Sequence, residues 1–283
     1  MTETIRNRRA ASLPAKLSRS WLLVNAAKEA LFAPAQASEA DSVIFDLEAS
    51  VAEDKKLEAR DNVVRALESG MSAWVRINKM ESEFWDDDLA AVAMLPGLRG
   101  VMLPETERPE QVSYTAMRAK AGLPVLALLE SARGVENATK IAEAPGTFRL
   151  AFGTNDFRKD TGFSGDPMAL AYARSRLTIA SRMGGLPGAI DGPSAADASD
   201  EQVREDADVT HNMGMTGKLV LNIDQVNALN EAMSPSEDER TWARQMLAAA
   251  EGGTEITDGS YLPRLARAKK IASLADTYGL WNA

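Results

Sequence analysis

Polar side chains that could do chemistry stand at or just after the ends of a series of short apolar runs. In chain order they are Asn25, Asp46, Glu48, Arg76, Asn78, Glu105, Glu130, Asp156, Asp191 and Asn222. Carboxylates that converge on one place repel each other unless a cation lies between them. Oxygen ligands without clustered histidine or cysteine favour Mg²⁺ or a similar hard ion. A fold that brings these residues together would therefore form a magnesium site, with Arg76 as a neighbouring cation.

Helix capping is the competing interpretation for some of these acids, because a side-chain oxygen at a helix start satisfies free backbone N–H groups. We favour capping for Glu105 and for Asp191, which precedes Gly192. Glu130 fits this interpretation less well. It ends the apolar run 125–129 and would be costly to desolvate without a partner.

The composition excludes several other chemistries. The chain has no cysteine and a single histidine, His211, so thiolate nucleophiles, disulfides and histidine-rich metal sites are excluded. A net charge of −9 argues against nonspecific nucleic-acid binding, which needs a basic surface. No apolar run approaches the roughly 20 residues of a membrane helix, and no apolar stretch follows the basic start. We expect a cytoplasmic protein without a nucleic-acid or membrane partner.

The apolar runs alternate with helix-like segments, which predicts an α/β fold. The runs are Trp21–Asn25, Ser42–Leu47, Ala73–Ile77, Gly100–Leu103, Pro124–Leu129, Arg149–Phe152, Gly188–Asp191 and Gly217–Leu221. Continuous apolar runs of this length are typical of parallel strands buried on both faces. Eight of them in 283 residues favour a (β/α)₈ TIM barrel, in which residues past the strand ends converge on one site. The weak seventh run leaves a doubly wound open sheet as the alternative.

The predicted domain organisation is a barrel over residues 1–235 and a C-terminal helical extension over 236–283. The segment Glu237–Ala250 has helical character, as does Pro263–Tyr278. These helices exceed what a barrel needs. They would pack on the barrel or reach a neighbouring subunit, and we expect a homo-oligomer, either a trimer or a hexamer.

Motif-like segments follow one another along the chain. They are Asp41–Glu48 (DSVIFDLE), Val75–Asn78 (VRIN), Met102–Pro104 (MLP), Leu129–Gly134 (LESARG), Phe152–Asp156 (FGTND), Ala173–Arg176 (ARSR) and Ala189–Gly192 (AIDG). In this order, and over most of the chain, they resemble the citrate lyase beta-subunit family. That family belongs to a larger aldolase superfamily that also holds malyl-CoA lyases.

The resemblance implies roles for the residues that match. Glu130 and Asp156 would hold Mg²⁺, and Arg76 would pair with the carboxylate of a keto acid, which suits its planar fork. The competing interpretation of Arg76 is a structural salt bridge to Asp46 or Glu48, which are themselves candidates for proton transfer. The loop that would orient the keto acid through its backbone N–H groups consists of Gly153, Thr154 and Asn155.

The resemblance further implies an Mg²⁺-dependent carbon–carbon lyase. It would cleave a hydroxyacyl thioester, such as citryl-CoA or malyl-CoA, to a short keto acid and an acyl thioester, or form it from these two. The keto acid would be of the oxaloacetate, pyruvate or glyoxylate class, and the thioester carrier would be CoA or an acyl carrier. Two alternatives stay open: a CoA-independent aldolase acting on free hydroxy acids, and a non-catalytic protein that binds keto acids.

The chain departs from the family pattern at the side where the thioester would enter. The family's VPG reads Val24-Asn25-Ala26, its LPK ends in Glu105, and Ala49 replaces an acid of its EDSV element. Asn222 stands where the family has histidine. Tyr261 stands where some members have an aspartate that acts in a neighbouring active site. The resemblance thus implies an intact metal and keto-acid end and an altered thioester end.

Overall fold

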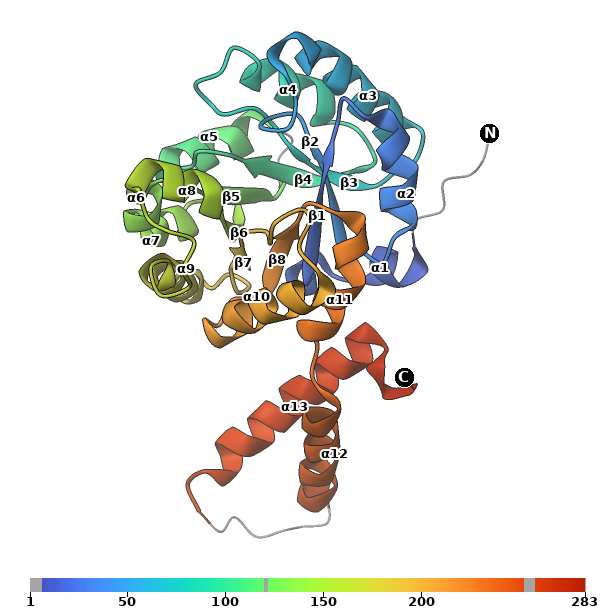
Figure 1. The fold of residues 1–283 in the computed structure, drawn as a ribbon, viewed down its shortest axis with the longest axis vertical. Coiled ribbons are helices and arrows are strands. Elements are labelled where there is room, and N and C mark those ends of the chain that lie inside the picture. The colour runs from blue at the N-terminus through green and yellow to red at the C-terminus, as the bar shows by residue number, and fades with distance from the viewer. Residues whose placement is uncertain (1–6, 120–121, 252–257, 283) are drawn as a thin grey trace. The chain divides into compact units, whose positions relative to one another are not determined.

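The strands form one closed parallel barrel in chain order (Figure 1). The computed structural model describes residues 7–119, 122–251 and 258–282. Its strands are β1 (Ser20–Asn25), β2 (Ser42–Asp46), β3 (Ala73–Arg76), β4 (Leu98–Leu103), β5 (Val125–Leu129), β6 (Thr147–Phe152), β7 (Ile190–Asp191) and β8 (Gly217–Val220). Because β1 pairs with β8, the predicted (β/α)₈ barrel is confirmed and the open-sheet alternative is wrong.

Helices between the strands surround the barrel (Figure 1). The α-helices are α1 (Arg8–Ser12), α2 (Phe32–Ala37), α3 (Lys56–Glu68), α4 (Trp85–Val92), α5 (Pro109–Arg118), α6 (Ala132–Glu136), α7 (Ala138–Ala142), α8 (Thr154–Thr161), α9 (Ala171–Met183), α10 (Asp200–Asn212), α11 (Val226–Ala232), α12 (Glu237–Glu251) and α13 (Tyr261–Tyr278). Short 3₁₀ turns occupy η1 (Ala15–Leu17), η2 (Glu29–Leu31), η3 (Glu53–Lys55), η4 (Ile223–Gln225) and η5 (Leu280–Asn282). Within the described ranges, no helix combines the length and apolar character that crossing a membrane requires.

The interior of the barrel is a packed core. Its buried side chains come from every strand: Trp21, Ile44, Trp74, Met102, Leu126, Leu128, Ala151, Ile190 and Leu219. The rings of Trp21 and Trp74 meet edge to face, with their centroids 5.4 Å apart. Full burial of side chains of this size stabilises a fold by roughly 1.5–3 kcal/mol each. This core leaves the carboxyl ends of the strands to carry the polar side chains.

The seventh strand is the weakest member of the barrel. β7 has two residues and meets β6 through a single register pair, Ala151 with Ile190. At the opposite end of the strands, the fully buried guanidinium of Arg149 spans the same region. It donates to the carbonyls of Gly188 at 2.6 Å and Ser18 at 3.0 Å, and to Thr216 Oγ1 at 2.9 Å. Arg149 thus supplies side-chain hydrogen bonds where the strand ladder is short.

A separate helical unit follows the barrel. The chain divides into two compact units between Leu229 and Asn230. In the second unit α12 packs against α13 through Ala243, Ala268 and Ile271. The expected domain boundary after residue 235 lies just before α12 and stays a prediction, since a division of contacts does not test independent folding.

Candidate active site at the barrel mouth

Arg76 and Asp46 form a buried, two-pronged ion pair at the carboxyl ends of β3 and β2. The two residues are register partners on neighbouring strands, so their side chains project from the same edge of the barrel. Arg76 Nε lies 2.6 Å from Asp46 Oδ1, and Nη2 lies 2.7 Å from Oδ2. A paired fork of this kind is the strongest arrangement between these groups. The structural salt bridge considered for Arg76 is therefore present.

The surroundings of Asp46 favour its ionised form. Burial by itself would raise the pKa of Asp46, but the Arg76 guanidinium outweighs it, together with hydrogen bonds from Ser50 Oγ and the Glu48 N–H. The pKa of Asp46 therefore lies below its ordinary value. Asp46 is held as a carboxylate that fixes Arg76 in place.

Glu48 lies on the other side of the same guanidinium. Its Oε2 is 3.3 Å from Arg76 Nη1. Burial raises the pKa of Glu48 above its ordinary value, even though Arg76 opposes that shift. Of the two acids considered for proton transfer, Glu48 is the one whose pKa moves toward neutrality. Sequence reasoning missed Lys56, whose buried ammonium donates to the Leu47 and Glu48 carbonyls at 2.8 and 2.7 Å and supports this loop.

Glu130 follows β5 and is buried at the mouth. Its Oε1 accepts a hydrogen bond from the Glu105 N–H at 2.6 Å. A Cβ atom on Gly153 would lie 2.5 Å from Glu130 Oε2, so the glycine leaves room for this carboxylate. Burial raises the pKa of Glu130 to about 8, with Glu48 and Asp156 adding to the shift while Arg76 opposes it. A buried carboxylate with so few partners is a candidate cation ligand.

The sequence predicts Asp156 at the end of a strand, and this prediction is wrong. Asp156 lies in the first turn of α8, four residues after Phe152, the last residue of β6. Its side chain is exposed, as is that of Asn155, while Thr154 is buried. The Gly153 N–H donates to the Leu129 carbonyl at 2.9 Å. Of the predicted orienting loop, Thr154 and Asn155 are the first residues of α8, whose N–H groups have no partner within the helix and can serve a ligand.

The donor set at Glu130 and Asp156 fits a magnesium ion rather than an all-protein cage. Both ligands offer hard carboxylate oxygens, and the charge of Asp156 raises the pKa of Glu130, which places the two acids within electrostatic reach. Among the described residues, no group of three or more Asp, Glu or His side chains could hold a metal. Mg²⁺ typically binds through one or two carboxylates and completes its octahedron with water and substrate oxygens.

Two other acids of the mouth have partners that sequence reasoning did not predict. Glu105, expected as a helix cap, instead pairs with Lys79 at 3.0 Å, so Arg76 is not the sole cation near the mouth. Glu105 also adopts a left-handed backbone conformation, with φ of 46°. Asp191, likewise expected as a cap, is fully buried and accepts hydrogen bonds from Arg174 and Thr210. No local sequence signal marks these pairs, because their members are far apart along the chain.

A cleft of about 390 Å³ opens beside Arg76 and Asp46, on the side of β1. Leucine, valine and proline side chains form much of its wall, and Lys28 contributes a cation. Asn25 and Asn222, two positions at which the chain departs from the family motifs, also line it. Two of the positions that depart from the family motifs therefore lie together, next to the arginine.

A parallel barrel with buried carboxylates and an arginine at its carboxyl end belongs to the class of (β/α)₈-barrel enzymes. Residues 19–223 match the family described as HpcH/HpaI aldolase/citrate lyase, and residues 238–279 match the HpcH/HpaI aldolase C-terminal domain. The chain belongs to this family. The predicted assignment to the citrate lyase beta-subunit type is thereby confirmed, and with it a family of lyases and related enzymes that act on CoA-linked substrates.

Individual relatives agree with this assignment. The chain is 32% identical to a citrate lyase subunit beta-like protein of Deinococcus radiodurans, over 92% of this chain and 98% of that protein. It is 33% identical to a (3S)-malyl-CoA thioesterase of Cereibacter sphaeroides, over 87% and 90%. Its fold is similar to that of CitE from Mycobacterium tuberculosis in complex with magnesium, acetoacetate and coenzyme A. That match has a TM-score of 0.77 and 28% identity, and covers 92% of this chain and 99% of that chain.

Proposed function

We propose that this protein is an Mg²⁺-dependent lyase that cleaves a hydroxyacyl thioester of CoA to a short keto acid and an acyl thioester, or forms it from these two. The observation that carries the proposal is the buried Glu130 carboxylate beside Asp156 and Arg76 at the barrel mouth. Similar proteins support it, since CitE from Mycobacterium tuberculosis has been solved with magnesium and pyruvate, and with magnesium, acetoacetate and coenzyme A.

Glu130 and Asp156 would hold the ion, which when bound supplies Lewis-acid polarisation of the substrate C–O bond. Arg76 would bind the keto-acid carboxylate through the donors that Asp46 leaves free, because Asp46 occupies only Nε and one N–H of Nη2. The N–H groups of Thr154 and Asn155 would orient the same acid. Gly153 contributes by lacking a side chain that would collide with Glu130.

Glu48 is the proton carrier that we propose on this side of the mouth. Burial raises the pKa of Glu48, whereas the pKa of Asp46 lies below its ordinary value. Asp46 then acts by positioning Arg76. The thioester would lie in the cleft lined by Asn25 and Asn222, with Lys28 available to a phosphate group.

Thioester hydrolysis is the second candidate function. It is favoured by the 33% identity to a (3S)-malyl-CoA thioesterase. A CoA-independent aldolase and a non-catalytic keto-acid-binding protein also stay open, because neither Asn222 nor Tyr261 is a good proton carrier near neutral pH. A trimeric or hexameric assembly likewise stays a prediction.

Product analysis with malyl-CoA, in Mg²⁺ and in EDTA, separates these functions. We expect slow, Mg²⁺-dependent formation of glyoxylate and acetyl-CoA. The double variant Asn222→His with Tyr261→Asp should be faster, by up to about 10²–10⁴, the typical contribution of general acid–base catalysis. Free CoA and malate without glyoxylate would identify a thioesterase.

Calorimetry with pyruvate, oxaloacetate or glyoxylate then tests the keto-acid end by itself. Binding that requires Mg²⁺ but is followed by no turnover would favour the non-catalytic alternative. No binding of any of the three acids in the presence of Mg²⁺ would contradict the proposal.

A further inference from the structure

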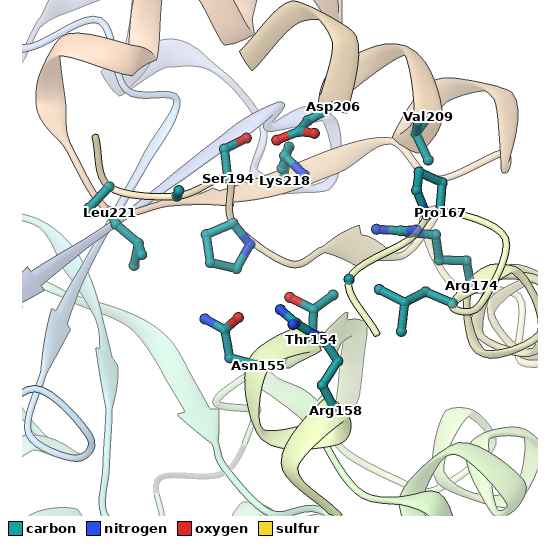
Figure 2. A pocket seen from close by; sticks show the side chains of 15 residues that line it. Thr154, Asn155, Arg158, Pro167, Arg174, Ser194, Asp206, Val209, Lys218 and Leu221 are labelled. Carbon is teal, nitrogen blue, oxygen red and sulfur yellow. The ribbon is translucent and has the colours of Figure 1, made fainter. Parts of the chain in front are cut away.

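A second polar pocket, of about 380 Å³, lies on the other side of the barrel mouth. The first turn of α8, the loop before α9, the segment after β7 and the end of β8 surround it. Figure 2 shows its polar side chains on opposing walls, with Ser194, Lys218 and Asp206 facing Thr154, Asn155 and Arg158, and Arg174 reaching in from one end. Thr154 and Asn155 of this pocket belong to the proposed keto-acid loop, and Leu221 also lines the cleft beside Arg76.

Arg174 is buried without a full set of partners. The residue is 7% exposed, and its Nε shares one N–H between the two oxygens of Asp191, at 3.1 Å each. Among the described residues, its Nη1 has no hydrogen-bond partner. Leaving a buried donor of a charged group unpaired is costly. The guanidinium therefore has spare donating capacity in the wall of the pocket.

Two further donors face the same space. Ser194 is 6% exposed, and its Oγ also has no partner among the described residues. The Arg158 side chain lies over Gly165, where a Cβ atom would be 3.3 Å from the guanidinium carbon. A side chain at position 165 would thus crowd the Arg158 guanidinium, which forms no hydrogen bond or ion pair with the part of the chain that the structure describes.

The charges around the pocket fit one negatively charged group. Arg158, Arg174 and protonated Lys218 supply three positive charges, and Asp191 and Asp206 supply two negative ones, which leaves +1. Lys218 Nζ donates to the Gly192 carbonyl at 2.7 Å and lies 3.7 Å from Asp191. Burial lowers the pKa of Lys218 below its ordinary value, so a bound anion would also stabilise its protonated form.

We propose that this pocket is a binding site for a small oxyanion, a carboxylate or a phosphate group, held by Arg174, Arg158 and the Ser194 hydroxyl. Each of these donors suits an oxygen acceptor, and the guanidinium groups can bind it through two parallel N–H bonds. The site needs no metal ion, because its positive charge comes from side chains. It rests on the pocket geometry and not on the proposed lyase activity.

The test uses the full-length protein in EDTA, so that a failure of the magnesium site does not affect it. Inorganic phosphate and acetate are titrated separately and followed by calorimetry. We expect saturable binding of at least one of them, and the tighter of the two identifies a phosphate or a carboxylate site. The absence of saturable binding for both ions would overturn the proposal.

Variants locate the binding. Arg158→Gln should weaken it by about tenfold or more, because the variant loses a charged hydrogen-bond donor. Arg174→Lys should weaken it similarly because the ammonium lacks the fork, and Ser194→Ala by less. Arg182→Gln is the matched control, because it removes the same charge from an exposed position near the end of α9.

If Arg174→Lys fails to fold, Arg158→Gln still tests the proposal, because Arg158 is exposed and its replacement should not affect folding. Wild-type affinity in Arg158→Gln and in a folded Arg174→Lys would overturn the proposal, and so would an equal loss in Arg182→Gln. Retained phosphate or acetate binding in Glu130→Gln would separate this site from the proposed metal site.

Discussion

Two arginine–aspartate pairs lie on opposite sides of the barrel mouth, and they are built differently. Arg76 meets Asp46 with two parallel hydrogen bonds, and Glu48 stands close to its remaining nitrogen. Arg174 meets Asp191 through one shared N–H, and Asp191 also serves Lys218 and Thr210. Arg76 thus has two carboxylates beside it, those of Asp46 and Glu48. On the other side of the mouth, Arg174 and Lys218 share the single carboxylate of Asp191.

The difference separates an arginine that lies between two carboxylates from one that, among the described residues, has a buried donor without a partner. In both pairs the pKa of the aspartate lies below its ordinary value despite burial, because Arg76 lowers that of Asp46, and Lys218, followed by Arg174, lowers that of Asp191. Arg76 is held in one orientation beside the proposed metal site. Arg174 is held from one edge only, which leaves Nη1 for a ligand. Geometry within the pair, rather than residue type, decides which donors a buried arginine keeps for a ligand.

The largest effect should come from removing the shared carboxylate. Asp191→Asn leaves Arg174 and Lys218 without their common partner, and we expect a loss of about 3–5 kcal/mol in the free energy of unfolding. Asp46→Asn should cost less, since Arg76 keeps Glu48. Urea denaturation in EDTA measures both, with the exposed Asp208→Asn as a control that changes stability little. A greater loss for Asp46→Asn would reverse the comparison.

The next largest effect should be a pH dependence of Mg²⁺ binding on the Arg76 side of the mouth, where Glu130 lies. The pKa of Glu130 is raised to about 8, so below that pH a proton competes with Mg²⁺. Apparent Mg²⁺ affinity should rise by up to about tenfold per pH unit toward pH 8 and then level off. Calorimetry in two buffers of different ionisation enthalpy would show the released proton. The exposed Glu143→Gln should leave this profile unchanged, whereas Glu130→Gln should abolish it.

The raised pKa of Glu130 also makes the stability of the fold depend on pH. Because its folded pKa lies above the unfolded value, Glu130 contributes stability that is present below the unfolded pKa and is lost as the pH rises through about 8. Metal-free Glu130→Gln should therefore melt at a higher temperature than the wild type above pH 8. A lower melting temperature there would contradict the burial of an unpaired carboxylate.

Arg76→Lys tests whether Arg76 binds the keto acid in addition to its ion pair with Asp46. The ammonium cannot keep both hydrogen bonds to Asp46, so we expect a stability loss of about 1 kcal/mol. If Arg76 also binds the keto acid, Mg²⁺-dependent pyruvate affinity should fall as well. Thermal shift and calorimetry on the same variant separate the two roles. Lower stability with unchanged pyruvate affinity would leave Arg76 a purely structural residue.

The smallest effect should come from the exposed pair Lys79–Glu105, whose side chains are 43% and 49% exposed. We expect Lys79→Ala to cost about 0.2–1 kcal/mol, and the difference from wild type to vanish in high salt. Chemical denaturation at two ionic strengths would measure it. A loss of unfolding free energy that does not change with salt would mean that Lys79 and Glu105 behave like the buried pairs Arg76–Asp46 and Arg174–Asp191.

The sequence predicts the barrel well because each strand is marked locally by an apolar run. Even the short run at Gly188–Asp191 corresponds to a strand, β7, although only its last two residues pair. The possible partners of Arg76 could also be foreseen, since the ends of neighbouring parallel strands meet. The pairing of Arg174 with Asp191 could not, because the rotation of α9 against the barrel decides which of its side chains faces β7.

The places of side chains on helices and loops were predicted less well, because they too depend on how each element packs against the barrel. Asp156 was expected at a strand end and lies in a helical turn, and Glu105 was expected as a cap and pairs with Lys79. A motif fixes the order of such residues along the chain. The direction of each side chain depends on packing between elements that are distant in sequence.

The Arg149 anchor beneath β7 has a consequence for motion. β7 shares one register pair with β6 and two with β8, so the seam on either side of it has few cross-strand hydrogen bonds to break. Partial opening there should cost less free energy than global unfolding, and amide hydrogens along the seam should exchange early. Arg149 fastens the amino-terminal end of the seam, which confines such breathing to the mouth. The barrel is thereby rigid at its base and compliant at the edge where the segment carrying Ser194 begins.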